Sequence, residues 1–441
     1  MAACLRRLHH ISLHVSDVEK IADDFVSKFK FHLFATRLTD RSRQLAFRTG
    51  SAVFVVNERG RNNRAALSLT GEEAAVVVDT HSRKQTGGYL YDFRPHYPVD
   101  TVCNVCFEVD DVQGSFDALR RLGCSFLVPP TTVRDRRGQV TYAVLKSILG
   151  NVCHTLIDKT RYDGSFLPGF DLVDEDPGAA AGDVCPVTHV DHVTMVAPIG
   201  TSQQVLSWYE RVLGFQRFFV HSEDDVDGGL VVNQNGKGLR LAAMELLKSS
   251  ETGIVLPSQR KHQPDCKFVI AESLPDQGRN QVDTFLEEHG AAGIQHIALY
   301  TSDILAATRM MADAGVPFYQ NPAAYYSQGE KQREILAAGC DPQKLAQNGI
   351  LLDTDQGQDL LAGQTRRYLL QVFTKPLFEE DTFFMELIER KGATGFGDGN
   401  IKALWACVQT YMDAENGKEV PKTPEGAGSR QTRQRSCSVS L

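Results

Sequence analysis

The chain has 441 residues, which is enough for two to three domains with sizeable hydrophobic cores. Hydrophobic residues make up 42% and charged residues 23% of the chain, the composition of an ordinary soluble globular protein. The net charge of −8 argues against nucleic-acid binding, and no apolar run approaches the roughly 20 residues of a membrane-spanning helix.

The first ten residues allow two interpretations. The segment MAACLRRLHH carries two arginines and no acidic residue, which weakly indicates a mitochondrial transit segment. Alternatively, LHHISLHV at residues 8–15 is already the first strand of the fold. We therefore expect a mitochondrial location, with a cytoplasmic one as the alternative.

The ten cysteines are scattered along the chain, which suits a reducing compartment. Cys103 and Cys106 form a CxxC pair inside VCNVCFEV, which has the pattern of a strand. Strand residues three apart face opposite sides of a sheet. We therefore expect a structural role for these cysteines rather than metal binding or redox work.

A degenerate repeat occurs four times, at residues 9–37, 102–126, 189–218 and 293–319. Each copy starts with a strand, continues with an amphipathic helix and returns to strand-like segments. In the first copy, Ser16 and Glu19 predict a capping box at the helix start. Gly214 and Gly315 are expected to end the helices of the third and fourth copies.

This βαβββ pattern resembles the vicinal-oxygen-chelate superfamily, in which paired modules curl into a half-open barrel around a metal. The predicted fold class is α+β, with four such modules paired into two half-open barrels. We assign residues 1–170 to the first barrel, with a surface insertion at about 60–100, and residues 188–413 to the second. The polar, Gly- and Ala-rich residues 171–187 form the predicted linker, and residues 414–441 a disordered tail.

Three apolar segments of the second barrel each carry one polar residue of metal-ligand type. His192 lies in VDHVTMV, His296 in GIQHIALYT and Glu386 in TFFMELIER. A charge that points into a core is costly unless it is paired or bound to a metal. Two histidines and one carboxylate on separate strands form the facial triad of a non-haem Fe(II) oxygenase. A lone histidine in a strand is more often a core residue, but three at equivalent places in successive repeats favour a metal site.

The first barrel lacks this set of ligands. His10, Asn104 and Thr155 occupy the positions equivalent to His192, His296 and Glu386. One histidine with an asparagine and a threonine is a poor iron site. We therefore predict one Fe(II) per chain, because only the second barrel has a complete metal site. The first barrel is expected to serve in packing, and its surface to form the interface of a homodimer.

The chain also resembles the 4-hydroxyphenylpyruvate dioxygenase and hydroxymandelate synthase family, most closely its dioxygenase-like branch. The resemblance covers nearly the whole chain before the tail. It is carried by FLVPP, RRGQVTYAVLK and YDGSFLPGF in the first barrel and by IQHIAL, LLQVFTKP, FFMELIER and GFGDGN in the second.

The resemblance implies a role for each matching residue. His192, His296 and Glu386 match the iron ligands. The remaining matches are three active-site glutamines, three aromatic pocket residues and the start of a C-terminal gating helix: Gln281, Gln295, Gln371, Phe373, Phe384, Phe396 and Asn400. The alternative is plain core packing for each phenylalanine and a structural hydrogen bond between strands for Gln371.

The implied reaction uses O₂ and a small aromatic 2-oxo acid that binds the iron through its carboxylate and keto oxygens. The substrate is its own reductant: it loses carbon dioxide and is hydroxylated, so no separate 2-oxoglutarate is needed. The protein contributes placement and electrostatics.

This sequence departs from the family at three places. A substrate-binding serine is replaced by leucine, either Leu241 or Leu256 depending on the alignment, and a substrate-binding asparagine by Ala271. A phenylalanine of the gating helix is replaced by Ile401. Hydroxymandelate synthase also tends to have an aliphatic residue there, and a positional change of about an ångström can decide such chemistry.

We therefore expect a benzylic hydroxylase that converts 4-hydroxyphenylpyruvate to 4-hydroxymandelate. The resemblance also suggests a mitochondrial role in supplying the ubiquinone head group. Two alternatives remain open: an ordinary homogentisate-forming dioxygenase of tyrosine catabolism, and a non-catalytic binding protein on an inherited scaffold.

Overall fold

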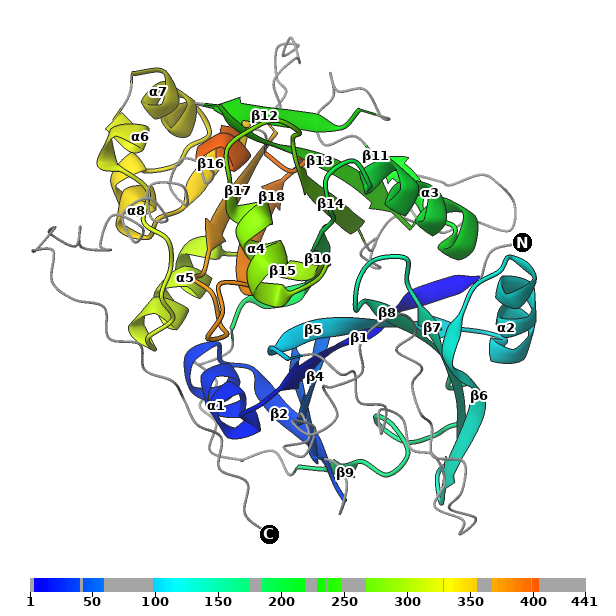
Figure 1. Ribbon diagram of the computed structural model, residues 1–441. Helices are drawn as coiled ribbons and strands as arrows, with labels where there is room; N and C mark the ends of the chain where they lie inside the picture. Colours follow the sequence, from blue (N-terminus) through cyan, green and yellow to red (C-terminus); the bar gives the residue numbers. More distant parts are fainter. Residues whose placement is uncertain are drawn as a thin grey trace, which may run out of the picture.

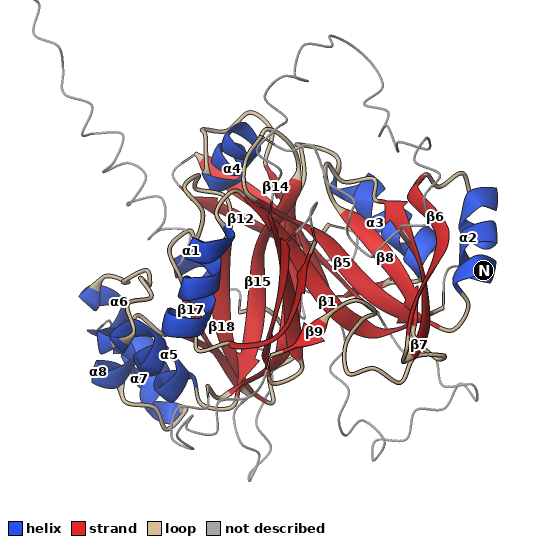
Figure 2. Ribbon diagram, turned by 90° about the horizontal axis from the view of Figure 1, so that it is seen from below, coloured by secondary structure: helices blue, strands red, loops and turns tan. Residues whose placement is uncertain are grey.

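The computed structural model describes residues 4–39, 43–58, 98–173, 185–218, 228–234, 236–246, 267–327, 329–354, 367–397 and 399–403. Within these ranges the chain forms two sheets of nine strands each, with helices on their outer faces (Figure 1, Figure 2). The predicted α+β class with paired modules is confirmed. Most of the predicted insertion, the middle of the predicted linker and the whole predicted tail lie outside the described residues.

The first sheet is built from the N-terminal part of the chain, in the order β6-β7-β8-β5-β1-β4-β3-β2-β9. Its strands are β1 (Leu5–Val15), β2 (His32–Leu38), β3 (Arg43–Thr49), β4 (Ala52–Glu58), β5 (Thr101–Val109), β6 (Phe126–Asp135), β7 (Gly138–Lys146), β8 (Cys153–Asp158) and β9 (Asp171–Leu172). The short strand β9 falls within the predicted linker and pairs with β2, so the first sheet extends to residue 172.

The second sheet has the order β11-β13-β14-β10-β15-β18-β17-β16, with β12 paired to β13, and it curls into a half-barrel. Its strands are β10 (Val187–Val196), β11 (Gln216–Phe218), β12 (Leu230–Gln234), β13 (Lys237–Glu245), β14 (Lys267–Ser273), β15 (Gly293–Thr301), β16 (Leu351–Thr354), β17 (Tyr368–Phe373) and β18 (Phe384–Lys391).

The two central strand pairs show the internal duplication residue by residue. β1 pairs with β5 antiparallel, and β10 pairs with β15 in the same way. Each pair has three register shifts, which follow Leu5, Leu8 and Ser12 in β1 and Val187, Val190 and Thr194 in β10. These are equivalent positions in the two strands. Bulges re-aim side chains and bend a strand, so the two barrels share the distortions that shape their inner faces.

The first helix of each module packs on the outer face of its sheet. These helices are α1 (Val18–Asp23), continued by the π-helix η1 (Asp24–Lys28), α2 (Val112–Arg121), α3 (Ser202–Leu213) and α5 (Ile304–Asp313). The predicted capping box of Ser16 and Glu19 is wrong. The helix α1 is capped by Asp17, whose side chain accepts from the backbone N–H of Lys20. Gly214 ends α3 in the left-handed conformation, as predicted.

Two further groups of helices were not predicted. α4 (Gln281–His289) packs against β14 and starts at a capping box formed by Asn280 and Asp283. α6 (Ala323–Ser327), α7 (Gly329–Ala337) and α8 (Pro342–Gln347) form a small cluster before β16. No helix in the described part of the chain has the length and apolar character needed to cross a membrane.

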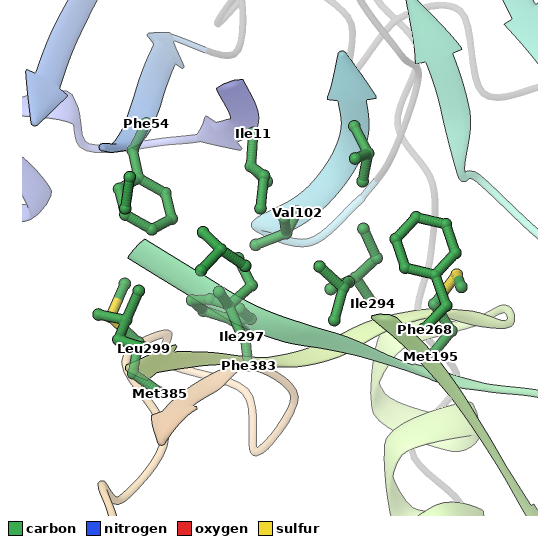
Figure 3. Close-up of a cluster of buried hydrophobic side chains, with 14 of the residues drawn as sticks. Ile11, Phe54, Val102, Met195, Phe268, Ile294, Ile297, Leu299, Phe383 and Met385 are labelled. Carbon is green, nitrogen blue, oxygen red and sulfur yellow. The ribbon is translucent and has the colours of Figure 1, made fainter. Parts of the chain in front are cut away.

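One hydrophobic core joins the two sheets (Figure 3). Ile11, Phe54 and Val102 of the first sheet face Met195, Phe268, Ile294, Ile297, Leu299, Phe383 and Met385 of the second part. All of these side chains are buried. Because the first barrel covers the outer face of the strands that carry His192 and His296, it supports the second barrel.

A backbone contact between the barrels should be sensitive to a single methyl group. A Cβ on Gly150 (φ +49°) would lie 1.9 Å from the carbonyl oxygen of Ala292, just before β15. We expect Gly150→Ala to lower the free energy of unfolding by about 1–3 kcal/mol more than Gly123→Ala. Gly123 is the matched control, because its φ is +80° but nothing lies within 4 Å of the added carbon. Urea denaturation measures the difference, and equal losses would contradict the contact.

A buried histidine also crosses the boundary between the barrels. The ring nitrogen Nε2 of His154 on β8 lies 2.9 Å from the hydroxyl of Tyr209 on α3, and Nδ1 lies 3.3 Å from the carbonyl oxygen of Val105. If Nδ1–H donates to the carbonyl, Nε2 accepts from the tyrosine, so both contacts suit the neutral imidazole. Burial lowers the pKa of His154 to about 4, although the Val105 carbonyl partly opposes the shift.

This shift predicts acid sensitivity. The folded pKa lies below the ordinary value of about 6.5, so protons bind the unfolded chain more tightly. The stability contributed by neutral His154 is complete above pH 6.5 and falls by on the order of 3 kcal/mol as the pH drops towards 4. In His154→Gln, which cannot take up this proton, unfolding free energy should fall less steeply over that range. Parallel pH curves for the two proteins would contradict the assignment.

Candidate metal centre

His192, His296 and Glu386 converge on one face of three neighbouring strands, β10, β15 and β18. The Nε2 atom of His192 lies 3.3 Å, and that of His296 3.6 Å, from Oε2 of Glu386. The carboxylate is 1% exposed, and the two imidazole rings are mostly buried. The predicted triad therefore exists as a buried cluster in the second barrel.

The cluster fits a divalent metal. When ligand atoms lie about 2.1 Å from an octahedral ion, adjacent ligand atoms are about 3 Å apart, close to the separations seen here. Two imidazole nitrogens and one carboxylate oxygen suit a first-row transition metal. The three groups line a cavity, so an ion bound to them would have free coordination positions facing the cavity.

Each histidine of the cluster has a different electrostatic environment. Burial lowers the pKa of His192, but the nearby carboxylates of Glu386 and Asp191 outweigh burial and raise it overall. The pKa of His296 falls well below its ordinary value because of burial and the neighbouring charge of His192. At neutral pH, His296 is thus neutral and ready to act as a ligand.

Asp191 and Arg390 hold His192 in place. The Nδ1–H of His192 donates to Oδ1 of Asp191 over 2.8 Å. Arg390 binds the same carboxylate through two hydrogen bonds of 2.7 and 2.8 Å. Asp191 is the extra residue of a β-bulge in β10, which turns its carboxylate towards the adjacent histidine. The arginine outweighs the effect of burial and holds the pKa of Asp191 well below its usual range, so the ring is oriented by a charged acceptor.

Gln371 fixes the carboxylate of the cluster. Its Nε2 donates to Oε1 of Glu386 over 2.8 Å and to the carbonyl oxygen of Phe396 over 3.3 Å. Its Oε1 accepts from Nδ2 of Asn400 over 2.8 Å. The expected hydrogen bond of Gln371 between strands therefore exists, from β17 to β18, and it orients Glu386 of the triad. Asn400 lies in the helical residues 399–403, so Gln371 also links the triad to this C-terminal helix.

A bulge brings a second glutamine into the cavity. Adjacent strand residues normally face opposite sides of a sheet, yet Gln295 and His296 both line the cavity. Gln295 is the extra residue where the register between β10 and β15 shifts after Thr194. Gln281, the first residue of α4, lines the same cavity. Among the described residues, neither glutamine side chain has a hydrogen-bond partner, so both amides are available to a ligand.

The rest of the cavity wall is mainly apolar. The predicted residues Phe373, Phe384, Phe396 and Ile401 all line it. Ala271, expected at a substrate-binding position, also lines the cavity, as does Leu241, which the sequence left open against Leu256. Three further lining residues were not predicted: Thr194, Leu239 and Val269.

Leu241 and Ala271 are direct partners across β13 and β14. This pairing favours Leu241 as the residue in place of the family serine, whereas Leu256 lies outside the described residues. Thr194 and Val269, missed from the sequence, are partners in the adjacent strands β10 and β14. Thr194 could have been found by counting two residues from His192 along the same strand face.

The first barrel has no such triad among its described residues. The register of β1, β5 and β8 places Asn104 and Thr155 where the second barrel has His296 and Glu386. Nδ2 of Asn104 donates to the hydroxyl of Thr155 over 2.8 Å. A hydrogen bond between neutral side chains thus replaces the ligand pair.

A different cluster, His9, His10 and Cys106, lies beside this position. The two Nδ1 atoms of the histidines are 2.5 Å apart, and the Lys159 ammonium lies 3.1 Å from Nε2 of His9. If Lys159 donates to His9 and His9 donates to His10, both neutral rings are satisfied without an ion. His9 occupies the bulge position of Asp191, so the supporting carboxylate is also missing here.

The duplicated sites predict the metal content directly. Alanine at His192, His296 or Glu386 should weaken binding of a divalent metal by more than about 100-fold, because it removes a ligand itself rather than a supporting residue. Thr155→Val, at the position equivalent to Glu386, should retain one tightly held ion per chain. Elemental analysis after dialysis measures both. Two ions per wild-type chain, or loss of metal in Thr155→Val, would refute the assignment of the site to the second barrel.

Comparison with known proteins gives long matches. The Glyoxalase/Bleomycin resistance protein/Dioxygenase superfamily model matches residues 189–333. The chain is 41% identical over 413 residues to the 4-hydroxyphenylpyruvate dioxygenase-like protein of Rattus norvegicus, covering 93% of this chain and 98% of that protein. It is 32% identical over 357 residues to 4-hydroxyphenylpyruvate dioxygenase of Pyricularia oryzae, covering 79% and 74% of the two chains.

A solved structure supports the fold. A mutant of 4-hydroxymandelate synthase from Streptomyces coelicolor matches 93% of this chain and 100% of its own, with a TM-score of 0.67 and 23% sequence identity. At this identity the likeness concerns the architecture of the two barrels.

Proposed function

We propose a specific reaction for this chain, which belongs to the 4-hydroxyphenylpyruvate dioxygenase-like family. The protein is an Fe(II)-dependent, O₂-using enzyme that oxidatively decarboxylates and hydroxylates 4-hydroxyphenylpyruvate, with 4-hydroxymandelate as the favoured product. The observation that carries the proposal is the buried His192–His296–Glu386 cluster at one end of a cavity with aromatic and aliphatic walls.

The lining of the cavity contains two chemically different groups of residues. His192, His296 and Glu386 would hold the Fe(II), which supplies Lewis-acid binding of the 2-oxo acid and activation of O₂. Gln281 and Gln295 offer uncommitted amides to the polar groups of the substrate. The apolar residues Leu241 and Ala271 are placed to surround its ring, so the cavity binds the substrate in one orientation.

The residues around the triad limit movement and access of water. Gln371 fixes Glu386 by a direct hydrogen bond, whereas Arg390 fixes His192 indirectly, by binding the Asp191 carboxylate that accepts from the ring. Phe384 stacks on His296 with ring centroids 4.6 Å apart, and Phe396 meets the ring of His192 edge-on at 5.0 Å. Rigid ligands and a dry aromatic shell keep the reacting groups in one geometry, on which catalysis by positioning depends.

The walls around the ring support the choice of product. Ile401 lines the cavity where the family resemblance expects a phenylalanine, and, like Leu241, it packs against the hydrophobic cluster that contains Phe396. A branched aliphatic side chain gives the substrate ring a less flat support than an aromatic one. Leu241 and Ala271 also lack the polar groups that would hold a ring hydroxyl. A ring held in this way can turn its benzylic carbon, rather than its face, towards the metal.

Replacement of one side chain tests this reasoning. Ile401→Phe should divert a minor but measurable share of product to homogentisate, because it restores a flat wall while Leu241 and Ala271 remain apolar. Ile401→Leu is the matched control and should keep 4-hydroxymandelate as product. The measurement is mass analysis after anaerobic loading with Fe(II), addition of 4-hydroxyphenylpyruvate and exposure to oxygen. Homogentisate as the sole product of the unmutated protein would overturn the product assignment.

Two other functions give different results in the same experiment. A homogentisate-forming dioxygenase, favoured by relatives such as that of Pyricularia oryzae, consumes oxygen and releases homogentisate. A non-catalytic binding protein binds metal and the 2-oxo acid without consuming oxygen. The complete cluster of ligand-type residues favours an enzyme over the binding protein.

The proposal extends to the place of the reaction. We assign it to the mitochondrion, in supply of the ubiquinone head group, with the cytoplasm as the alternative. Both arginines of the first ten positions lie in β1 and form ion pairs with Asp110 and Glu108, so this placement is supported by the family resemblance and not by a transit segment. Import of the full chain into isolated mitochondria, followed by protease protection, tests it; a chain that stays accessible to protease belongs to the cytoplasm.

A further inference from the structure

Within the part of the chain that the structure describes, two buried polar atoms at the triad lack hydrogen-bond partners. They are the hydroxyl oxygen Oγ1 of Thr194 and the ring nitrogen Nδ1 of His296. Thr194 is 2% exposed, and both residues line the cavity. Buried polar atoms are nearly always paired in folded proteins, so two unpaired atoms in one place call for an explanation.

The two residues face each other across a strand pair. Thr194 on β10 and His296 on β15 are direct Cα partners in the antiparallel register. The Cβ atoms of such partners lie about 4.5–5.5 Å apart, within reach of a side-chain contact. Thr194 has a single χ1 torsion to adjust, and one staggered step exchanges its methyl group with its hydroxyl. A small rearrangement would therefore bring a hydroxyl oxygen to the imidazole.

The other histidine of the triad shows what such a contact does. Nδ1–H of His192 donates to Asp191, which leaves Nε2 free to bind a metal. Histidines that bind metals almost always donate their second ring N–H to an acceptor, which fixes the tautomer and the ring orientation. His296 presents Nε2 towards Glu386 over 3.6 Å but has no such acceptor for Nδ1. Thr194, the partner of His296 across the strand pair, is placed to be that acceptor.

We propose that Thr194 is a positioning residue for His296, its hydroxyl accepting a hydrogen bond from Nδ1–H when Nε2 binds the metal. The inference rests on the proposed metal site. The two histidines are then supported unequally, His192 by a charged carboxylate and His296 by a neutral hydroxyl, which accepts the weaker hydrogen bond. His296 is accordingly the ligand whose placement depends most on a single uncharged neighbour.

Removal of the unpaired hydroxyl should change fold stability and metal affinity in opposite directions. In metal-free protein it is a buried group without a partner, so its removal should stabilise the fold. In the metal-bound protein the same removal should weaken the site. A residue with a merely structural role would not change stability and metal affinity in opposite directions.

The experiment compares Thr194→Val, which keeps the shape but removes the hydroxyl, with Thr194→Ser, which keeps the hydroxyl. Thermal unfolding is measured on metal-free protein, and affinity by titration with Co(II), whose absorption also reports the ligand geometry. We expect Thr194→Val to raise the unfolding temperature by about 1–3 °C and to weaken Co(II) binding by about 10- to 100-fold. Thr194→Ser should bind Co(II) nearly as the wild type does.

Ser12 is the matched control. It occupies the position of Thr194 in the first barrel, faces Asn104 rather than a histidine, and its hydroxyl is also buried without a partner. Ser12→Ala should raise the unfolding temperature without changing Co(II) affinity. Thr194→Ala gives the same comparison as Thr194→Val should the valine variant fail to fold.

Unchanged Co(II) affinity in both Thr194→Val and Thr194→Ala would overturn the inference. This holds also if these variants bind 4-hydroxyphenylpyruvate more weakly, because Thr194 would then act on the substrate and not on His296. A joint fall of stability and affinity would also overturn it, because that pattern indicates simple damage to the fold. Wild-type protein that binds no Co(II) would instead refute the proposed metal site itself, which distinguishes the two failures.

Discussion

The structure depends on the burial of one carboxylate, Glu386, between two imidazoles inside a β-barrel. An ionised carboxylate that is 1% exposed is strongly unfavourable unless charges or hydrogen bonds surround it. Gln371 donates to one of its oxygens, and His192 and His296 approach the other. A bound cation would complete this arrangement. The Gln371 hydrogen bonds connect this buried carboxylate to the C-terminal helix as well.

The duplicated architecture explains how one site can be lost while the fold is kept. The two barrels share strand order and bulge positions around their centres, yet Asn104 and Thr155 bind each other where a histidine and a carboxylate would bind a metal. The first barrel now contributes a shared hydrophobic core and polar contacts such as that of His154 with Tyr209. The first barrel thus has a structural role, because it buries the back of the strands that carry His192 and His296.

Sequence analysis predicted the parts that follow from local pattern. The four modules and the triad could be found because strand periodicity places His192, His296 and Glu386 at equivalent positions in successive repeats. The bulge that turns Gln295 into the cavity depends on pairing between distant strands, which no local pattern encodes. Thr194 was within reach of the local pattern, because it lies two residues after His192 on the same strand face. Asp17 rather than Ser16 caps the first helix because neighbouring polar residues compete for one role.

The central claim is that a single iron binds between His192, His296 and Glu386, and anomalous diffraction tests it most directly. Crystals grown anaerobically with Fe(II) would be measured on both sides of the iron absorption edge. The account predicts one anomalous peak per chain, within bonding distance of Nε2 of both histidines and of the Glu386 carboxylate. A peak in the first barrel beside His9, His10 and Cys106, or no peak at the triad, would contradict it.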